Sequence, residues 1–252
     1  MSHATPPQQP TFEQQNHFLL RKLHSLTGII PIGAFLVEHM LTNSLAIFGP
    51  ERFNKAVHGL HDLPWLIGLE VFGIFLPIAF HAIYGVKIAM TADYNTANYP
   101  YLNNRRYTLQ RVTGYIAFVF LIIHLMKFRF AHLLGWGPEF IGNPDPFGVT
   151  QNGILHWSPG GIAIPAGVTI AFYILGLWAA CYHFANGIWT FCISWGITIG
   201  EKAQKRVGCG AAGIGVLLFV WGCLSLYALA TTKHEPSTAT PAPKVVYTPS
   251  GG

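Results

Sequence analysis

Long apolar runs separated by short polar segments dominate the pattern of hydrophobic and polar positions along the chain. A helix needs about 20 residues to cross a hydrocarbon layer of ~30 Å, and the runs are long enough for this. We therefore predict five membrane-spanning helices, over about residues 20–44, 64–91, 107–131, 162–193 and 207–231. The predicted fold class is all-α and integral to the membrane, with the five helices forming a bundle.

The polar segments divide the chain into three parts. Residues 1–17 form a polar N-terminal arm, residues 18–231 the five-helix membrane domain, and residues 232–252 a Pro- and Thr-rich tail that we expect to be disordered. Turn-rich segments at 43–63, 91–106, 132–161 and 194–206 separate the helices. The third contains Gly142-Asn143-Pro144-Asp145-Pro146 and Ser158-Pro159-Gly160-Gly161, which predict a loop.

Composition agrees with a membrane protein, since 51% of the residues are hydrophobic and only 10% are charged. A soluble domain carries about 25% charged residues. The net charge of +5 comes from basic residues clustered between the apolar runs. No basic-aromatic surface or nucleic-acid motif accompanies them, so nucleic-acid binding is not predicted.

The placement of Lys and Arg predicts the orientation, because loops kept in the cytoplasm are enriched in both. With the N-terminal side taken as inner, nine basic residues lie inside and six outside, which places the N-terminus in the cytoplasm. The inner set is Arg21, Lys22, Lys87, Arg105, Arg106, Arg111, Lys202, Lys205 and Arg206. The outer set is Arg52, Lys55, Lys127, Arg129, Lys233 and Lys244.

An internal repeat relates the first four predicted helices. Leu23-His24-Ser25-Leu26-Thr27-Gly28 opens the first helix, and Leu109-Gln110-Arg111-Val112-Thr113-Gly114 opens the third. The second and fourth each contain His-x-x-x-Gly, from His81 to Gly85 and from His183 to Gly187. The four helices therefore form two copies of a helix pair.

Four of the twelve histidines lie deep within predicted spans, where ionisable residues are usually functional. At about 1.5 Å per residue, His39 and His124 lie roughly 22–24 Å from the inner ends of the first and third helices. The second and fourth helices run the other way and carry His81 and His183 about 22 Å down from the outside. The histidines thus form an outer and an inner pair.

Two imidazoles facing each other at one depth are what a six-coordinate haem iron needs, and such a haem transfers electrons because no position is left for oxygen. We therefore predict two stacked b haems. Zinc is the alternative, but its structural sites prefer four N/S ligands at short spacings that this sequence lacks. Nearby glycines either let the macrocycle approach or allow close helix packing; these are Gly28, Gly33, Gly85, Gly114 and Gly187.

These motifs resemble the dihaem cytochrome b subunit of succinate:quinone oxidoreductases, in particular the single-anchor type found with menaquinone in Gram-positive bacteria and their relatives. The resemblance runs from about Phe18 to Leu229 and rests on the following segments: Arg21-Lys22-Leu23-His24-Ser25-Leu26-Thr27-Gly28, Phe80-His81-Ala82-Ile83-Tyr84-Gly85, Leu109-Gln110-Arg111-Val112-Thr113-Gly114 and His183-Phe184-Ala185-Asn186-Gly187-Ile188-Trp189. The longer N-terminal arm, the larger 132–161 segment and the tail depart from the family.

The resemblance implies a multi-pass protein of the bacterial cytoplasmic membrane, with a flavoprotein and an iron–sulfur subunit on its cytoplasmic side; a higher oligomer of the complex stays open. His81 and His183 would hold the proximal haem iron, and His39 and His124 the distal one. His24 and Ser25 resemble residues that bond a propionate of the proximal haem. Arg111 would add positive charge there or serve as an ordinary inner-face anchor.

The quinone, menaquinone or another, is expected beside the distal haem. Candidate proton-handling groups are Glu38, Glu70, His58, His61 and Asp62, although a solvated or capping role is an alternative for the last three. Direction stays open: the chain would reduce quinone as part of succinate dehydrogenase, or oxidise quinol as a fumarate reductase anchor. The cytochrome b subunit of another dehydrogenase and a redox-silent anchor are the further alternatives.

Overall fold

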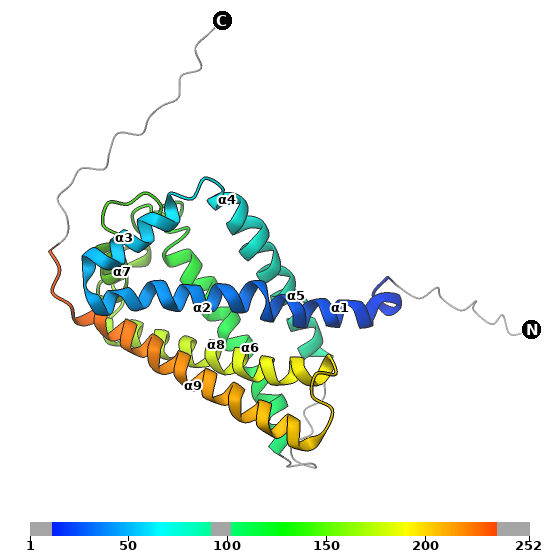
Figure 1. The fold of residues 1–252 in the computed structure, drawn as a ribbon. Helices are drawn as coiled ribbons and strands as arrows, with labels where there is room; N and C mark the ends of the chain where they lie inside the picture. The colour runs from blue at the N-terminus through cyan, green and yellow to red at the C-terminus, as the bar shows by residue number, and fades with distance from the viewer. Residues whose placement is uncertain (1–11, 92–101, 236–252) are drawn as a thin grey trace, which may run out of the picture. The chain divides into compact units, whose positions relative to one another are not determined.

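The computed structural model describes residues 12–91 and 102–235 of the chain (Figure 1). These residues form helices and connecting segments, with no strand among them. Five stretches in the described part of the chain are long and apolar enough to cross a membrane: Gln15–Phe48, Leu66–Met90, Asn104–Lys127, Ala166–Ser194 and Glu201–Thr231. The predicted all-α fold with five spanning helices is confirmed.

The first stretch combines α1 (Phe12–Ile29), α2 (Pro31–Ser44) and a 3-10 turn, η1 (Leu45–Phe48). The second combines α4 (Leu66–Gly68), the π-helical η2 (Leu69–Phe75) and α5 (Leu76–Met90). The other long helices are α6 (Leu102–Lys127), α8 (Ala166–Ser194) and α9 (Glu201–Thr231). The shorter α3 (Pro50–His61), α7 (Pro146–Leu155) and η3 (Pro159–Gly161) lie in the connecting segments.

Proline explains the break in the first span. Pro31 has no N–H to donate to the carbonyl of Thr27, so α1 ends at Ile29 and α2 begins at Pro31. Hydrogen bonds continue on either side, from the Ile30 N–H to the Leu26 carbonyl at 2.9 Å and from the Ala34 N–H to the Ile30 carbonyl at 3.2 Å. The two helices therefore follow one another along one direction (Figure 1).

A second proline accounts for the π-helical segment. Pro77 cannot donate to the carbonyl of Gly73 four residues earlier. Just before it the helix widens, and the Leu76 N–H donates to the carbonyl of Val71, five residues back. A π-turn at this point keeps the span helical across the missing donor.

The chain folds into two compact units, each assembled from three separate stretches of sequence. The first unit comprises the described residues of Met1–His39, Ile67–Phe118 and Leu177–Phe219. The second unit comprises those of Met40–Leu66, Val119–Gly176 and Val220–Gly252. The expected arm and tail fall partly on residues 1–11 and 236–252, which lie outside the described residues, and α1 already begins at Phe12, within the expected arm.

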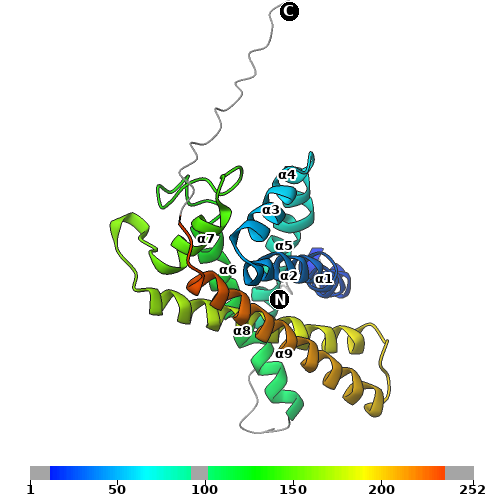
Figure 2. The ribbon, with the colours of Figure 1, turned by 60° about the vertical axis from the view of Figure 1, so that its left-hand side comes forward.

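In the first unit, α8 and α9 lie side by side in antiparallel directions (Figures 1 and 2). A Cβ added at Gly215 of α9 would lie only 2.7 Å from the Cβ of Ala185 in α8. Small residues thus allow the backbones to approach closely, as they do between helices in membranes. Apolar side chains face outward elsewhere in this unit: Phe72 is 74% exposed, Ile83 70% and Val216 64%, a surface suited to lipid.

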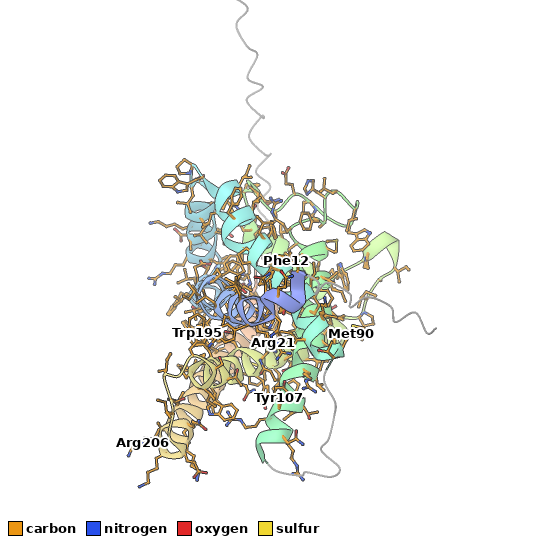
Figure 3. All side chains as sticks on the ribbon, turned by 90° about the vertical axis from the view of Figure 1, so that its right-hand side faces the viewer. Phe12, Arg21, Met90, Tyr107, Trp195 and Arg206 are labelled. Atoms are coloured by element: carbon orange, nitrogen blue, oxygen red, sulfur yellow. The ribbon has the colours of Figure 1, made fainter. Side chains whose placement is uncertain are left out.

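Helix ends from several parts of the chain gather on one side of the first unit. Figure 3 views this side and shows Arg21 of α1, Met90 of α5, Tyr107 of α6, Trp195 after α8 and Arg206 of α9. Basic and aromatic side chains occur together at such ends of membrane proteins, where the chain meets water. Arg21 and Arg206 thus lie on the same side, as they do in the inner set of basic residues defined from the sequence.

In the second unit, α3 and α7 build a small apolar core. Its buried members are Ala46, Phe53, Val57, Phe147, Ile154 and Leu229, and the Phe53 and Phe147 rings meet edge to face at 5.7 Å. The prediction of a loop throughout 132–161 is therefore wrong. Asp145 caps α7 by accepting the Gly148 N–H at 3.1 Å, and Pro146 fills the first helical position.

Candidate functional site

The histidine on α5 is held by a backbone carbonyl of α1. The Nδ1–H of His81 donates to the carbonyl oxygen of His24 at 2.9 Å, and the hydroxyl of Thr27 donates to the same oxygen at 3.0 Å. A Cβ added at Gly28 would lie 2.5 Å from the His81 ring, and one added at Gly85 would lie 2.9 Å from the His24 ring. Both glycines make room for an imidazole.

The histidine on α8 is held in the same way by α6. The Nδ1–H of His183 donates to the carbonyl oxygen of Gln110 at 3.0 Å, and the hydroxyl of Thr113 lies 3.3 Å from that oxygen. A Cβ added at Gly114 would lie 3.0 Å from the His183 ring, and one added at Gly187 would lie 3.8 Å from the Gln110 side chain. The sequence repeat is therefore also a structural repeat within the first unit.

The second copy carries a polar network of side chains around its histidine. The Gln110 amide donates to the His183 carbonyl at 3.1 Å and accepts from the Asn186 amide at 2.9 Å. Arg106 Nε donates to Asn186 Oδ1 at 3.1 Å, and its guanidinium stacks over the Trp189 ring at 3.8 Å. Asn186 is only 3% exposed, so the network fixes the side of His183 that faces α6.

The two anchored histidines face each other. The ring centres of His81 and His183 are 6.1 Å apart, and the rings are nearly perpendicular at 88°. Because Nδ1 of each ring is hydrogen-bonded, Nε2 is the nitrogen left for a metal. A metal–imidazole bond is about 2 Å long, so two such bonds in line would separate ring centres by roughly 6 Å. The spacing and the tautomers both suit one metal ion between the rings.

The outer histidines have aromatic surroundings. His39 of α2 lies in the first unit, with its ring centre 5.5 Å from that of Phe35. His124 of α6 lies in the second unit, stacked on Phe120 at 5.6 Å. In the tautomer that leaves Nε2 for a metal, the Nδ1–H of His124 donates to the Tyr173 hydroxyl at 3.3 Å. His39 and His124 therefore contact different side chains, and their pairing at one haem stays a prediction.

Comparison with known proteins decides the family. No protein-family model matches the chain. The succinate dehydrogenase cytochrome b558 subunit of Bacillus subtilis (strain 168) is 39% identical to it over 188 residues, which are 75% of this chain and 85% of the relative. The chain belongs to the cytochrome b subunits of succinate dehydrogenase. A cytochrome b carries haem b, and the His81–His183 pair has the donor chemistry for its iron, since the porphyrin supplies the other nitrogens.

The three residues expected to contact a haem propionate in this cytochrome b have different neighbours. The His24 ring stacks on that of His81 at 4.0 Å, and its buried Nδ1 finds no hydrogen-bond partner among residues 12–91 and 102–235. Ser25 instead accepts from Trp195 Nε1 at 2.9 Å. Arg111 is 9% exposed and lies over the Tyr107 ring at 4.1 Å. His24 is the one best placed toward His81.

The residues expected at the quinone fall into two groups. His58, His61 and Asp62 end α3 in the second unit, where His58 Nε2–H donates to the Asn143 carbonyl at 3.0 Å and His61 packs edge-on against Phe140 at 5.6 Å. The Asp62 N–H caps α3 by donating to the His58 carbonyl at 2.9 Å. The other two belong to the first unit: Glu38 lies beside His39 in α2, and Glu70 lies in the π-helical η2.

Sequence reasoning missed two polar clusters in the second unit. Asp145 accepts from Asn54 at 3.0 Å and from His234 at 2.7 Å; burial favours a higher pKa, but these bonds hold the pKa of its carboxyl below the ordinary value. The Asp-Pro helix start could have indicated this cap. The count of basic residues places Lys127 on the outer side, and the structure shows it only 5% exposed at the end of α6. Its position within the predicted span 107–131 could have indicated that the side chain is buried.

Proposed function

We propose that this cytochrome b chain binds two b haems and passes electrons from succinate to a quinone on behalf of the complex that it anchors. His81 and His183 would ligate the inner haem, and His39 and His124 the outer one. The name of the Bacillus subtilis relative favours succinate oxidation as the direction. The proposal for the inner haem rests on the 6.1 Å spacing of two imidazoles, each anchored through Nδ1.

The residues of the first unit would orient the ligands. The carbonyls of His24 and Gln110 fix the tautomer of each ring and raise its basicity as a ligand. Gly28 and Gly114 let each ring lie against the neighbouring helix without displacement. Bound haem supplies a reversible one-electron carrier, and two histidine ligands leave no open position for oxygen.

We place quinone chemistry on the outer side, near His39 and His124. Glu38, beside His39, and Glu70 are carboxylates within spans, which is where proton-handling groups of membrane proteins lie. The α3 end with His58, His61 and Asp62 would serve proton exchange with the outside water. Menaquinone is the proposed quinone.

The chain would lie in a bacterial cytoplasmic membrane with its N-terminus inside, because the richer set of basic residues is on that side. A flavoprotein and an iron–sulfur subunit would bind there. Residues 1–17 and 232–252 would flank the membrane domain as arm and tail.

Haem content and subunit composition test the proposal. The complex purified in mild detergent should contain about two low-spin haems per copy of this chain, together with the flavoprotein and iron–sulfur subunits. His81→Ala and His183→Ala should lose the same haem, while His39→Ala and His124→Ala should lose the other. His156→Ala, at an exposed position in the second unit, is the control and should retain both. One haem in the wild type, or loss of different haems within a pair, would contradict the assignment.

Direction has its own test. Electrons that move from the inner to the outer side of a membrane that is negative inside gain about 2.3 kcal/mol per charge per 100 mV. That gain would help reduce a low-potential quinone such as menaquinone. An uncoupler should therefore slow succinate-dependent menaquinone reduction in intact cells, and an unchanged or faster rate would argue against the proposed direction.

A further inference from the structure

A lysine is enclosed by aromatic rings in the second unit. Lys127 Nζ lies 4.7 Å from the ring centre of Trp157, 4.7 Å from that of Tyr173 and 5.5 Å from that of Phe128. The side chain is 5% exposed, and Nζ has no hydrogen-bond partner among the described residues. Aromatic faces attract a cation, but they do not accept its N–H groups as an oxygen does.

A second donor in the same cluster also finds no acceptor. Nε1 of Trp157 is buried and has no hydrogen-bond partner among residues 12–91 and 102–235. The cluster is tightly packed as well: a Cβ added at Gly153 of α7 would lie 2.8 Å from the Phe128 ring and 3.4 Å from Cε of Lys127. An ammonium and an indole N–H therefore lie together, and neither has a hydrogen-bond acceptor in the described part of the chain. Leaving such donors unpaired is costly.

The cluster adjoins one of the four histidines. Lys127 follows His124 by three residues on α6, so both lie on one face of the helix. Tyr173 joins them, because its ring is one wall around Nζ and its hydroxyl lies 3.3 Å from His124 Nδ1. Lys127 and His124 therefore share Tyr173 as a neighbour, and a haem carries propionate carboxylates at its edge.

We propose that Lys127 and Trp157 together bind a propionate carboxylate of the haem ligated by His124. Nζ of Lys127 supplies the positive charge, and Nε1 of Trp157 a second hydrogen bond. The two donors would stabilise the carboxylate and so help to fix this edge of the macrocycle. This inference rests on the proposed function, since it requires a haem at His124.

The test is a redox titration of both haems in the purified complex, with Lys127→Gln as the first variant. Both haems should remain, and the haem that is lost in His124→Ala should become harder to reduce. At a fixed potential its ratio of reduced to oxidised form should fall about tenfold, or 59 mV for a one-electron couple. Lys127→Arg keeps the charge and should restore most of the potential. Trp157→Phe keeps the ring and should give a smaller fall, about threefold.

Lys55→Gln is the matched control, because it removes the same charge from an exposed position of α3 in the same unit. It should leave both potentials unchanged. An unchanged outer potential in Lys127→Gln, or an equal shift in Lys55→Gln, would overturn the inference, as would a changed KM for a quinone analogue with unchanged haem potentials. If Lys127→Gln does not assemble, an unshifted potential in Trp157→Phe overturns it. Fewer than two haems in the wild type would instead overturn the proposed function.

Discussion

The two helix pairs of the first unit hold a histidine by the same backbone device and surround it with different side chains. In α1 and α5 the His24 carbonyl anchors His81, and in α6 and α8 the Gln110 carbonyl anchors His183. A glycine four residues after each of these carbonyl residues makes room for the anchored ring. The side chains at the anchoring positions differ completely, since one is a stacked imidazole and the other an amide within a network.

The comparison distinguishes the features that both histidines require from those that belong to one helix pair. A carbonyl is present whatever the residue, so the position of the helix backbone, rather than the identity of the side chain, fixes each ring. The glycine is the residue that cannot be exchanged without moving the ring. The side chains at the His24 and Gln110 positions are then free to serve other purposes.

The largest effect is expected from replacing the glycines against which the His81 and His183 rings lie. In Gly28→Ala the new Cβ would lie 2.5 Å from the His81 ring, and in Gly114→Ala 3.0 Å from the His183 ring. Overpacking of this kind costs about 1–3 kcal/mol, and here the strain falls on a ligand. We expect Gly28→Ala to lose most of the inner haem and Gly114→Ala to lose a smaller part, measured as haem per protein in the purified complex.

Gly210→Ala is the control for the glycine variants. Gly210 lies in the same unit, in α9, and a Cβ there would meet nothing within 4 Å. This variant should keep both haems. Full haem content in Gly28→Ala would show that the His81 ring is not held against α1 in the assembled protein.

Breaking the network of the second pair should have the next largest effect. Asn186→Leu would leave Arg106 Nε and Gln110 Oε1 without their partner, at a cost of about 1–3 kcal/mol. We expect a lower midpoint for the thermal loss of inner-haem absorbance. Tyr84 holds the equivalent place in the first pair, three residues after His81, and Tyr84→Phe should lower that midpoint much less. Equal effects would mean that the network adds nothing to the second pair.

The sequence predicted the spans and the repeat because both depend on spacing along the chain. It did not predict what the glycines face. Approach of a macrocycle and close helix packing were the two alternatives, whereas Gly28, Gly85 and Gly114 face imidazole rings and Gly33 faces the ring of Phe184. Spacing fixes which side of its own helix a residue occupies, but not which side chain of a neighbouring helix fills the space beside it.

The structure of the connecting segments was harder to predict from the sequence than that of the spans. The Gly/Pro density of 132–161 predicted a loop, yet the same residues contain the Asp145 cap and the Pro146 start of α7. Proline and glycine interrupt a helix or begin one, depending on whether tertiary contacts stabilise the residues after them. Here the buried Phe147 and Ile154 supply those contacts, and they pack against α3, a segment distant in sequence.

A smaller effect is expected from the threonines that share the anchoring carbonyls. Thr27→Val would remove the hydroxyl that donates to the His24 carbonyl. Thr113→Val would remove one that lies 3.3 Å from the Gln110 carbonyl and donates to that of Leu109 at 2.7 Å. Each change should cost about 1 kcal/mol. The midpoint for loss of inner-haem absorbance should fall in both. Thr190→Val is the matched control, because its hydroxyl donates to the Gly187 carbonyl at 3.0 Å, for which no histidine bond is present among the described residues. If the midpoint fell equally in Thr190→Val, the hydroxyls of Thr27 and Thr113 would have no special part in holding the histidines.

The smallest effect is expected from replacing the His24 side chain while its backbone carbonyl stays in place. His24→Gln removes a ring stacked on His81 at 4.0 Å but keeps the carbonyl that anchors it, and the new amide still offers an N–H donor in place of His24 Nδ1. We expect full haem content in His24→Gln, with only a slight shift of the inner-haem spectrum. Gly85 leaves space beside this position for the new side chain. Loss of the inner haem in His24→Gln would instead mean that the His24 ring itself, and not its carbonyl, is what the first pair requires.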